Sequence, residues 1–538
     1  MNTYFNKFAR IMARNLFVFG VVCMVSVADS ESPRHYSVRD FGAVGDGIHM
    51  DTAAIQKAVD AAENGGVVEF PAGTYLSGTI LLKSGVTLHL DFGATLLGST
   101  DLADFPVLDC PYRSYTDKYT QRALLWGYGL HDIVLTGHGT ISGQGATFEG
   151  KPYLERPFII RFVQCSNVRV EDLSLRDAPM WMQHYLACDG VYVRGIQVWN
   201  HCNKNNDMID IDGCRDVRIS DCISDTDDDG LTLKSTSDRA CENVVIANCI
   251  LASHCNALKM GTESNGGFKN IAISNCAIRQ SADDQPIAGR REGISGISLE
   301  IVDGGTLDQV VVSNVTIDGV LVPLFLRLGD RARPFKPDMP KPGVGRFRNV
   351  VLSNIVAKGA SKLGCSITGL PEHPIENVTL DNIRIEYAGG GTLEDAGRAV
   401  DELPDKYPEA FMFGTLPAYG FYCRHVDGLT LRNAGVSVAS EDRRPALVCD
   451  DVTRLHIEQF DGTCAESSPG LMQFRNVRHA LVTGCSPSQH VPVLLNAQSA
   501  CSSISLIGND LSHVAKAVVA DPGTPRRAVK SKGNMRDR

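Results

Sequence analysis

Four aspartates are the side chains of this 538-residue chain best suited to acid–base chemistry. Asp227, Asp228 and Asp229 are consecutive, and Asp207 lies 21 residues before Asp228. Carboxylates held close together repel one another, which raises the pKa of one of them and keeps it protonated. Hydrolysis of a glycosidic bond needs one protonated carboxyl and one ionised carboxylate. The cluster therefore predicts such catalysis, with a solvated acidic turn or a calcium site as the alternative.

Three short segments that contain these residues can be aligned by their apolar positions. They are residues 205–212, 227–234 and 254–261. In this alignment Ile209, Leu231 and Leu258 stack, as do Ile211, Leu233 and Met260. Asp207 then lies beside Asp229, and the following segment adds Asn256 and His254. The alignment predicts that residues distant in sequence form one acidic surface.

A longer repeat explains why these segments align. The aliphatic residue after an Asn or its equivalent recurs in steps of 23, 26, 27 and 27 at Val168, Val191, Val217, Val244 and Ile271. Looser copies follow at Val310, Val350, Val378, Leu429, Leu455 and Leu481. A repeat of this length built of short β-branched strands is typical of one coil of a parallel β-solenoid. The competing antiparallel sandwich would have turns every ~8 to 12 residues and no long fixed period.

The chain is expected to form one long domain, residues 29–520, between two different termini. Residues 1–28 have a basic start, an apolar run and a small-residue end, which predicts a cleaved signal peptide rather than a membrane anchor. Residues 52–62 predict an amphipathic helix, capped by Asp51 or Thr52, that covers the first coil. Residues 521–538 are expected to be a disordered tail. The net charge of −10 argues against a nucleic-acid partner, and we expect a monomer without stable membrane insertion.

The sequence resembles glycoside hydrolase family 28, the polygalacturonases and rhamnogalacturonan hydrolases. The family's Asn-Thr-Asp motif corresponds to Asn205-Asn206-Asp207 and its Asp-Asp pair to Asp228-Asp229, and the opening segments 36–47 and 70–75 are similar to those of many pectin-active proteins. The resemblance implies a single-stranded right-handed parallel β-helix that cleaves pectin with inversion. It implies Asp228 as the general acid, Asp207 and Asp229 holding and deprotonating the water, and no cofactor or metal. An inverting pair of carboxyls should be about 6.5–9.5 Å apart.

Two departures from the family leave parts of the site open. The family's Gly-His-Gly motif has no clean copy, so either His254, as a catalytic helper, or Asn256 fills the histidine position. The basic Arg-Ile-Lys clamp for a uronate is replaced by residues 296–300, which end in Glu300. Either another base takes its place or the sugar there is neutral, as rhamnose would be. The candidate bases are Lys259, Arg290, Arg291, Arg327 and Arg331.

The remaining predictions concern substrate contacts and rival functions. We expect a pectic polysaccharide or oligosaccharide to contact Asn205, Asn256, Lys259, Trp181, His184 and Glu300. A polysaccharide lyase of the same fold is one alternative, although it would use a basic residue to abstract a proton. A non-catalytic carbohydrate-binding solenoid is the other.

The 17 cysteines at first suggest a disulfide framework. They recur with the repeat, however, at Cys165, Cys188, Cys214 and Cys241 and again at Cys222, Cys249 and Cys276. A free cysteine behaves as a small buried apolar residue, so these columns fit the interior of stacked coils. Some pairing between coils stays open, because stacked positions lie within disulfide range.

Overall fold

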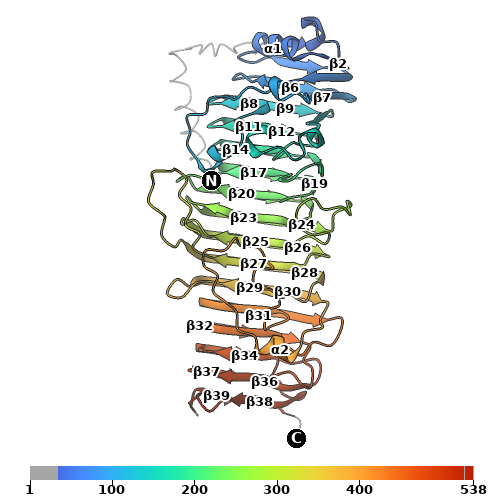
Figure 1. Ribbon diagram of the computed structural model, residues 1–538. Helices are drawn as coiled ribbons and strands as arrows, with labels where there is room; N and C mark the ends of the chain where they lie inside the picture. Colours follow the sequence, from blue (N-terminus) through green and yellow to red (C-terminus); the bar gives the residue numbers. More distant parts are fainter. Residues whose placement is uncertain (1–33, 526, 537–538) are drawn as a thin grey trace, which may run out of the picture. The chain divides into compact units, whose positions relative to one another are not determined.

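The protein, seen in a computed structural model, is a parallel β-helix over the part that the structure describes. That part comprises residues 34–525 and 527–536, so the predicted signal peptide lies outside it. Each coil contributes a strand to each of three sheets, and all named strand pairs are parallel. Figure 1 shows the strands stacked coil upon coil from β2 to β38. The all-β solenoid expected from the repeat is confirmed.

The first sheet carries the acidic residues. Its strands are β5 (Ile80–Leu81), β8 (Ala123–Tyr128), β11 (Phe158–Val163), β14 (Gln183–Leu186), β17 (Ile209–Asp212), β20 (Leu231–Ser235), β23 (Asn256–Ser264), β25 (Ser295–Ile301), β27 (Val322–Leu328) and β29 (Cys365–Thr368). It continues through the first residues of two longer strands, β31 (Phe421–Val438) and β32 (Leu447–Glu458), to β34 (Met472–Arg475), β36 (Val491–Gln498) and β38 (Val514–Ala520).

The second and third sheets close each coil. The second holds β1 (His35–Ser37), β3 (Val67–Phe70), β6 (Thr87–Leu90), β9 (His131–Gly137), β12 (Ser166–Glu171), β15 (Asp189–Arg194), β18 (Arg215–Ser220) and β21 (Cys241–Ala247). The third holds β2 (Asp46–Met50), β4 (Gly73–Ser77), β7 (Ala94–Gly98), β10 (Thr140–Ser142), β13 (Ser174–Arg176), β16 (Gln197–Asn200), β19 (Ile223–Thr226) and β22 (Ile250–Ser253).

From β24 onward one long strand runs through the corner between the second and third sheets. These strands are β24 (Phe268–Arg279), β26 (Thr306–Asp318), β28 (Arg346–Ala360), β30 (Ile375–Tyr387) and β31. β32 instead joins the first and second sheets. β24 pairs with both β21 and β22, which shows that it belongs to both sheets. Shorter strands return at the C-terminal end: β33 (Asp461–Gly462), β35 (Arg478–Thr483), β37 (Ser502–Ile507) and β39 (Val529–Lys532).

The predicted aliphatic column forms the interior of the second sheet. Val168 pairs with Val191, Val217 with Val244, and Val244 with Ile271, all of them buried. The column continues through Val310, Val350, Val378 and Leu429 to Leu455. Its last step was wrong by one residue, because Leu455 pairs with Ala480 rather than Leu481. A shift of one residue turns a side chain to the other face of the sheet.

An asparagine ladder holds the corner between the second and third sheets. Asn248, Asn275, Asn314, Asn354, Asn382 and Asn433 all have positive φ near 50–60°. Each donates its side-chain amide to the residue one coil back, at 2.8–3.4 Å. Asparagine tolerates the left-handed backbone conformation. The recurrence of asparagine in the sequence therefore marks a turn as well as a hydrogen-bonded stack.

The two ends of the solenoid differ from expectation in detail. Helix α1 (Thr52–Ala61) has Asp51 at its N-cap position, but the Asp51 side chain accepts from the backbone amides of Val44 and Gly45 instead of capping the helix. At the C-terminus, part of the tail that was predicted to be disordered forms a strand, β39, which pairs with β37. No helix among the described residues is long and apolar enough to cross a membrane.

Candidate active site

The acidic residues lie together at the start of three adjacent strands of the first sheet. Ile209 pairs with Leu231 and Leu231 with Leu258, as the alignment predicted. Asp207 lies two residues before the first of these partners and Asp229 two before the second, and Asn256 holds the same place in β23. The regular pairing of parallel strands therefore brings Asp207 beside Asp229 and Asp229 beside Asn256.

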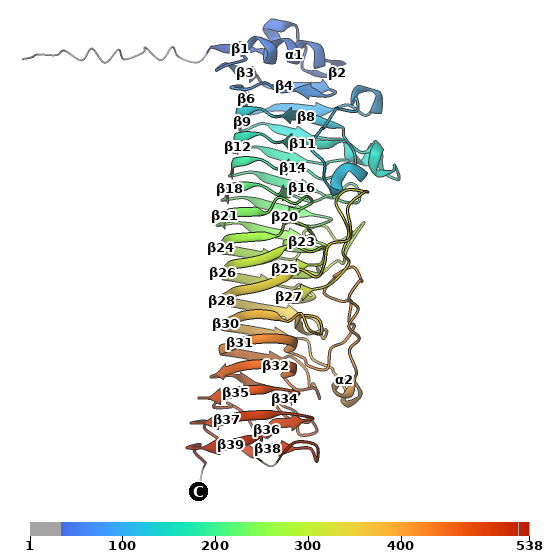
Figure 2. The same cartoon turned by 90° about the vertical axis from the view of Figure 1, so that its left-hand side faces the viewer.

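Long loops surround these strands and form a cleft of about 380 Å³. Figure 2 shows such loops along one side of the coils, among them the segment that carries α2 (Leu393–Gly397). The cleft is lined by Tyr115, Lys118, Tyr119, Tyr153, Trp181, Asn205, Asp207, Asp228, Asp229, Lys234, Glu263, Arg331, Arg333 and Tyr407. Four tyrosines and a tryptophan among them supply apolar surface for a sugar ring, while the charged groups supply the chemistry.

Asp229 and Asp228 have different partners although they are neighbours in sequence. Asp229 accepts from the Asn256 amide at 2.8 Å and forms an ion pair with Lys259 at 2.9 Å. Asp228 forms no ion pair with any residue that the structure describes, and its side chain accepts from the Asp229 backbone amide and, at 3.4 Å, from Asn205. Burial and the neighbouring Asp229 charge raise the pKa of Asp228 to about 6. The two carboxyls thus lie in different electrostatic environments.

Asp207 shares a buried lysine with two other carboxylates. The Lys234 ammonium lies 3.9 Å from Asp207, 3.3 Å from Asp210 and 3.7 Å from Glu263. Burial and the Asp210 charge raise the pKa of Asp207 well above its usual range, and Lys234 opposes that rise. Burial would also raise the pKa of Glu263, but Lys234 and Arg333 outweigh it and lower that pKa to about 2. Lys234 therefore balances the negative charge at the base of the cleft.

One oxygen each of Asp228 and Asp229 lie within 4.8 Å of one another. The expected separation of 6.5–9.5 Å is therefore not found between the nearest oxygens of this pair. Asp207, on the neighbouring coil, also faces the same cleft.

His254 does not line the cleft. Its buried imidazole contacts Asp227 through Nδ1 and the Asp283 backbone carbonyl through Nε2, both at 3.0 Å. Asp227 also accepts from the backbone amides of Ile287 and Ala288 at 2.7 Å. His254 thus fastens the loop of residues 280–294 to the acidic turn, whereas Asn256 is the residue that contacts a cleft carboxylate.

Trp181 and His184, predicted to contact sugar, are placed differently from one another. Trp181 lines the cleft, where the Lys234 ammonium lies 4.9 Å from its ring centroid. His184 is fully buried and hydrogen-bonded to Asp212 at 3.0 Å. Burial lowers the pKa of His184 to about 4, despite the opposing effect of Asp212. His184 is a neutral residue beneath the cleft wall and does not line the cleft.

Glu300 also lies below the surface of the cleft. It is fully buried and its side chain accepts from the Ser298 hydroxyl at 2.6 Å. In the backbone register of β25 and β27, Glu300 lies opposite Arg327. Burial raises the pKa of Glu300 to about 7, although Lys259 opposes the rise. Glu300, which was expected to contact the substrate, therefore does not line the cleft.

Of the five bases considered as replacements for the clamp, Arg331 alone lines the cleft. Its guanidinium lies 4.9 Å from the Tyr407 ring centroid, and its buried Nη1 has no hydrogen-bond partner among the described residues. Lys259 is paired with Asp229, Arg327 donates to backbone carbonyls of Glu402 and Leu403, and Arg290 lies over Phe411. Arg291 does not line the cleft.

Several lining residues were not predicted from the sequence. Lys234 had a signal, because it lies in the same aligned segment as Asp229 and alternates with buried Leu233. Arg333 and Tyr407 had none, since they come from irregular loops that no repeat places. Loop conformation depends on tertiary contacts, such as the ion pair of Arg333 with Asp303.

Two groups of side chains in the described region bring three potential metal-ligand atoms within 4.8 Å of one another. One comprises Asp228, Asp229 and Cys255, but burial raises the pKa of the Cys255 thiol well above its usual range, which disfavours the thiolate that binds metal. The other comprises His201, His254 and Asp283, in which both His254 nitrogens already have partners. Neither group presents an open set of ligands.

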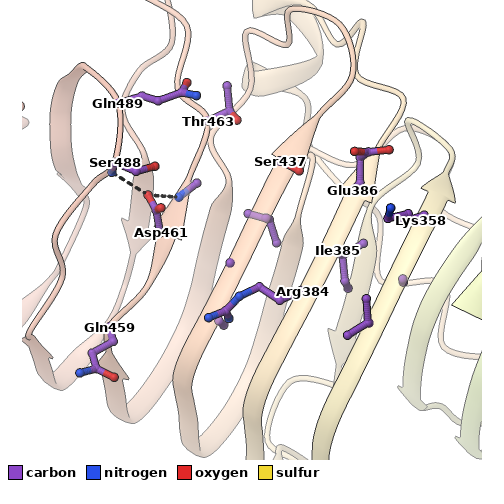
Figure 3. Close-up of a pocket in the computed structure, with 16 residues that line it drawn as sticks. Lys358, Arg384, Ile385, Glu386, Ser437, Gln459, Asp461, Thr463, Ser488 and Gln489 are labelled. Carbon is purple, nitrogen blue, oxygen red and sulfur yellow. Dashed lines mark hydrogen bonds between the residues drawn. The ribbon is translucent and has the colours of Figure 1, made fainter. Parts of the chain in front are cut away.

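A separate hollow of about 360 Å³ lies on the C-terminal coils (Figure 3). Lys358, Arg384, Glu386, Ser437 and Asp461 line it, together with residues of neighbouring strands and loops. None of the predicted site residues lies there, so it is not part of the acidic cleft.

Comparison with known proteins gives one matching family model. The model of the glycosyl hydrolases family 28 matches residues 64–400. A probable polygalacturonase of Vitis vinifera is 34% identical over 218 residues, which cover 37% of this chain and 44% of that protein. An exo-poly-alpha-D-galacturonosidase of Dickeya chrysanthemi is 36% identical over 129 residues, 22% of this chain and 21% of that protein. The chain thus spans less than half the length of either relative.

Solved structures share the fold. An exopolygalacturonase of Thermotoga maritima has a TM-score of 0.55 at 21% identity, covering 66% of this chain and 88% of its own. A family 28 exopolygalacturonase of Yersinia enterocolitica has a TM-score of 0.55 at 18% identity, with 84% and 78% covered. At these identities the likeness concerns the parallel β-helix alone.

Proposed function

Because this chain belongs to family 28 of the glycosyl hydrolases, we propose that it is a secreted enzyme that hydrolyses α-glycosidic bonds in a pectic polysaccharide. The observation that carries the proposal is the cleft in which Asp207, Asp228 and Asp229 meet with different partners. The polygalacturonase names of the sequence relatives support the choice of substrate. Secretion rests on the basic start and apolar run of residues 1–28.

Asp228 is the general acid in this proposal. With a pKa of about 6 and no cation beside it, it keeps a proton in mildly acidic solution and can give it to the leaving oxygen. Asp207 and Asp229 hold the attacking water; Asp229 deprotonates it, because the adjacent Lys259 stabilises its negative charge, whereas the raised pKa of Asp207 suits that carboxyl to positioning the water. Water attack on the face opposite the leaving group inverts the anomeric centre, and no metal takes part.

Arg331 supports an acidic sugar in the cleft. A guanidinium with an unpartnered nitrogen is suited to the two oxygens of a carboxylate. The neighbouring Arg333 is less free, because its guanidinium already pairs with Asp303 and Glu263. Polygalacturonan or the galacturonate of a rhamnogalacturonan would both present such a carboxylate, and a neutral rhamnose would not.

Hydrolysis is favoured over elimination by the state of the lysines. A lyase would need a free Lys or Arg to abstract the C5 proton, but Lys234 and Lys259 both lie in ion pairs with cleft carboxylates. Arg331 remains as a cation in the cleft, and in this proposal its charge binds the sugar carboxylate. A non-catalytic binding solenoid would not require three carboxylates with divided environments. The enzyme is therefore proposed to act as a monomeric hydrolase on polysaccharide rather than on nucleic acid or at a membrane.

Asp228→Asn tests the proposal. We expect the wild type to release reducing ends from a panel of pectic polymers without ultraviolet absorbance from a new double bond, and the variant to be slower by about 10²–10⁴-fold. Proton NMR of the first product should show the inverted anomer. The control is Asp221→Asn, which changes an exposed turn aspartate remote from the cleft lining. Ultraviolet absorbance that rises at the same rate as cleavage, or full activity of Asp228→Asn, would refute the assignment.

A further inference from the structure

The third sheet carries a hollow of its own, of about 230 Å³, over β13, β16 and β19. Arg176, Trp199 and Asp225 lie side by side on these strands in register. Ser174, Gln197 and Ile223 form the next row, because alternate residues of a strand point to the same face. No residue lines both this hollow and the acidic cleft. We call it the Trp199 hollow.

Two polar side chains in the Trp199 hollow are free to bind a ligand. Arg176 and Gln197 are both exposed, and neither side chain makes a hydrogen bond or ion pair with another residue of the described region. Half-buried Trp199 lies opposite Arg176 on the adjacent strand and two residues after Gln197 on its own strand. An aromatic face beside an unpaired guanidinium is therefore available to solvent at this place.

The far side of the hollow is held rigidly. Trp199 packs against His201 with ring centroids 4.7 Å apart, and His201 contacts Asp225 at 3.0 Å. Asp225 also pairs with Arg279 at 3.0 Å and accepts from the Ser281 hydroxyl at 2.6 Å. Its carboxylate is only 4% exposed, whereas Arg279 is 41% exposed. Because Asp225 balances the charge of Arg279, Arg176 is the cation of the hollow that has no ion-pair partner among the described residues.

We propose that the Trp199 hollow is a second saccharide-binding site, which holds a hexuronate unit of the polysaccharide outside the cleft. The apolar C–H face of the pyranose packs on the Trp199 ring. The carboxylate of the sugar pairs with Arg176 in a two-pronged contact. The identity of the polysaccharide rests on the proposed function. By contrast, the hollow in Figure 3 contains charged groups but no aromatic residue.

The position of the hollow suggests its use. β19 leads directly into Asp227-Asp228-Asp229, so the hollow lies on the same coil as the general acid, on the adjacent sheet. A chain bound there is kept near the cleft between cleavage events, which raises its local concentration. The gain should be confined to polymers long enough to reach both sites.

The number of binding sites for galacturonate trimer tests this proposal. By isothermal titration calorimetry, the Asp228→Asn protein should bind one more trimer than the double variant Asp228→Asn/Trp199→Ala. Arg176→Ala changes an exposed residue, so we expect it to fold normally and to weaken the second site at least fivefold. The matched control is Tyr192→Ala, an aromatic residue stacked between Arg169 and Arg218 on the second sheet. It should leave every site intact.

Hydrolysis separates this proposal from the proposed function. Trp199→Ala in the otherwise wild-type chain should lower kcat/KM on polygalacturonan about fivefold and leave cleavage of the trimer unchanged. If the Trp199→Ala and Arg176→Ala changes alter neither the number nor the affinity of sites, the second site is refuted. If the wild type cleaves no pectic polymer while the Trp199-dependent site persists, the proposed function fails and the second site stands.

Discussion

Asp228 differs from its neighbours in lacking a cation, and its protonation should set the upper pH limit of activity. A general acid must carry its proton, and the pKa of Asp228 is raised to about 6 by burial and the Asp229 charge. We expect kcat to fall as the pH rises through about 6, by about tenfold per pH unit well above it. Initial rates between pH 4 and 8 measure this. A rate that stays constant to pH 8 would contradict the role of Asp228.

Lys234 should be essential to the charge balance of the cleft. Lys234→Met leaves Asp207, Asp210 and Glu263 buried without their shared cation. Removing one partner of a buried ion pair costs about 3–5 kcal/mol, and kcat should fall at least tenfold. Without the cation the pKa values of these carboxyls rise, so the stability deficit should shrink as the pH is lowered.

Denaturant titrations at pH 5 and 7 measure the effect of Lys234→Met. Lys269→Met is the control, because Lys269 forms an exposed ion pair with Glu242 that contributes little. Equal stability losses in the two variants, or a deficit that grows at low pH, would show that Lys234 does not balance these carboxylates.

At the scale of single elements, the corner between the second and third sheets depends on its asparagines. Asn314 has φ of 56°, donates to Asn275 at 3.1 Å and accepts from Asn354 at 2.9 Å. Asn314→Ala should destabilise the protein by about 2 kcal/mol, because it adds left-handed strain to the lost hydrogen bonds. Asn314→Gly should cost less, since glycine is free of that strain. Denaturation midpoints that rank alanine above glycine would contradict this explanation.

The loops are the elements that convert a regular solenoid into a cleft. His254, Asp227 and Asp225 tie residues 280–294 to the acidic turn through backbone amides and a carbonyl. Farther along the chain, residues 329–345 and 388–420 bring Arg331, Arg333 and Tyr407 to the same cleft. Each coil supplies the carboxylates in register, but these insertions decide which sugars can approach them.

At the scale of the whole molecule, stacking protects every sheet except at its ends. β39 covers β37 at the C-terminal end. A chain ending at residue 520 should unfold several degrees lower and aggregate, because β37 becomes an uncovered edge. A chain ending at residue 536 is the control and should match the full-length protein. Thermal melts with light scattering measure both, and equal melting of the two shortened chains would refute a stabilising role for β39.

Stacking also explains the cysteines. All sixteen cysteines in the described region are free, and fourteen of them are buried. Three cysteines of the first column, Cys188, Cys214 and Cys241, bond backbone carbonyls of a preceding coil, as Cys214 does with Tyr185 at 3.1 Å. They are small interior residues of a repeating core, and the structure holds no disulfide between the coils it describes.

The sequence by itself determined the solenoid, its period and the register of Asp207, Asp229 and Asn256. It could do so because parallel strands repeat one pattern of side chains per coil, so a local spacing becomes a spatial neighbour. Tertiary structure alone decided that His254, His184 and Glu300 are buried beneath the cleft, and that Arg331 and Tyr407 reach it. The direction in which a side chain points at a turn, and the course of a long loop, depend on contacts between distant segments. No period in the chain encodes those contacts.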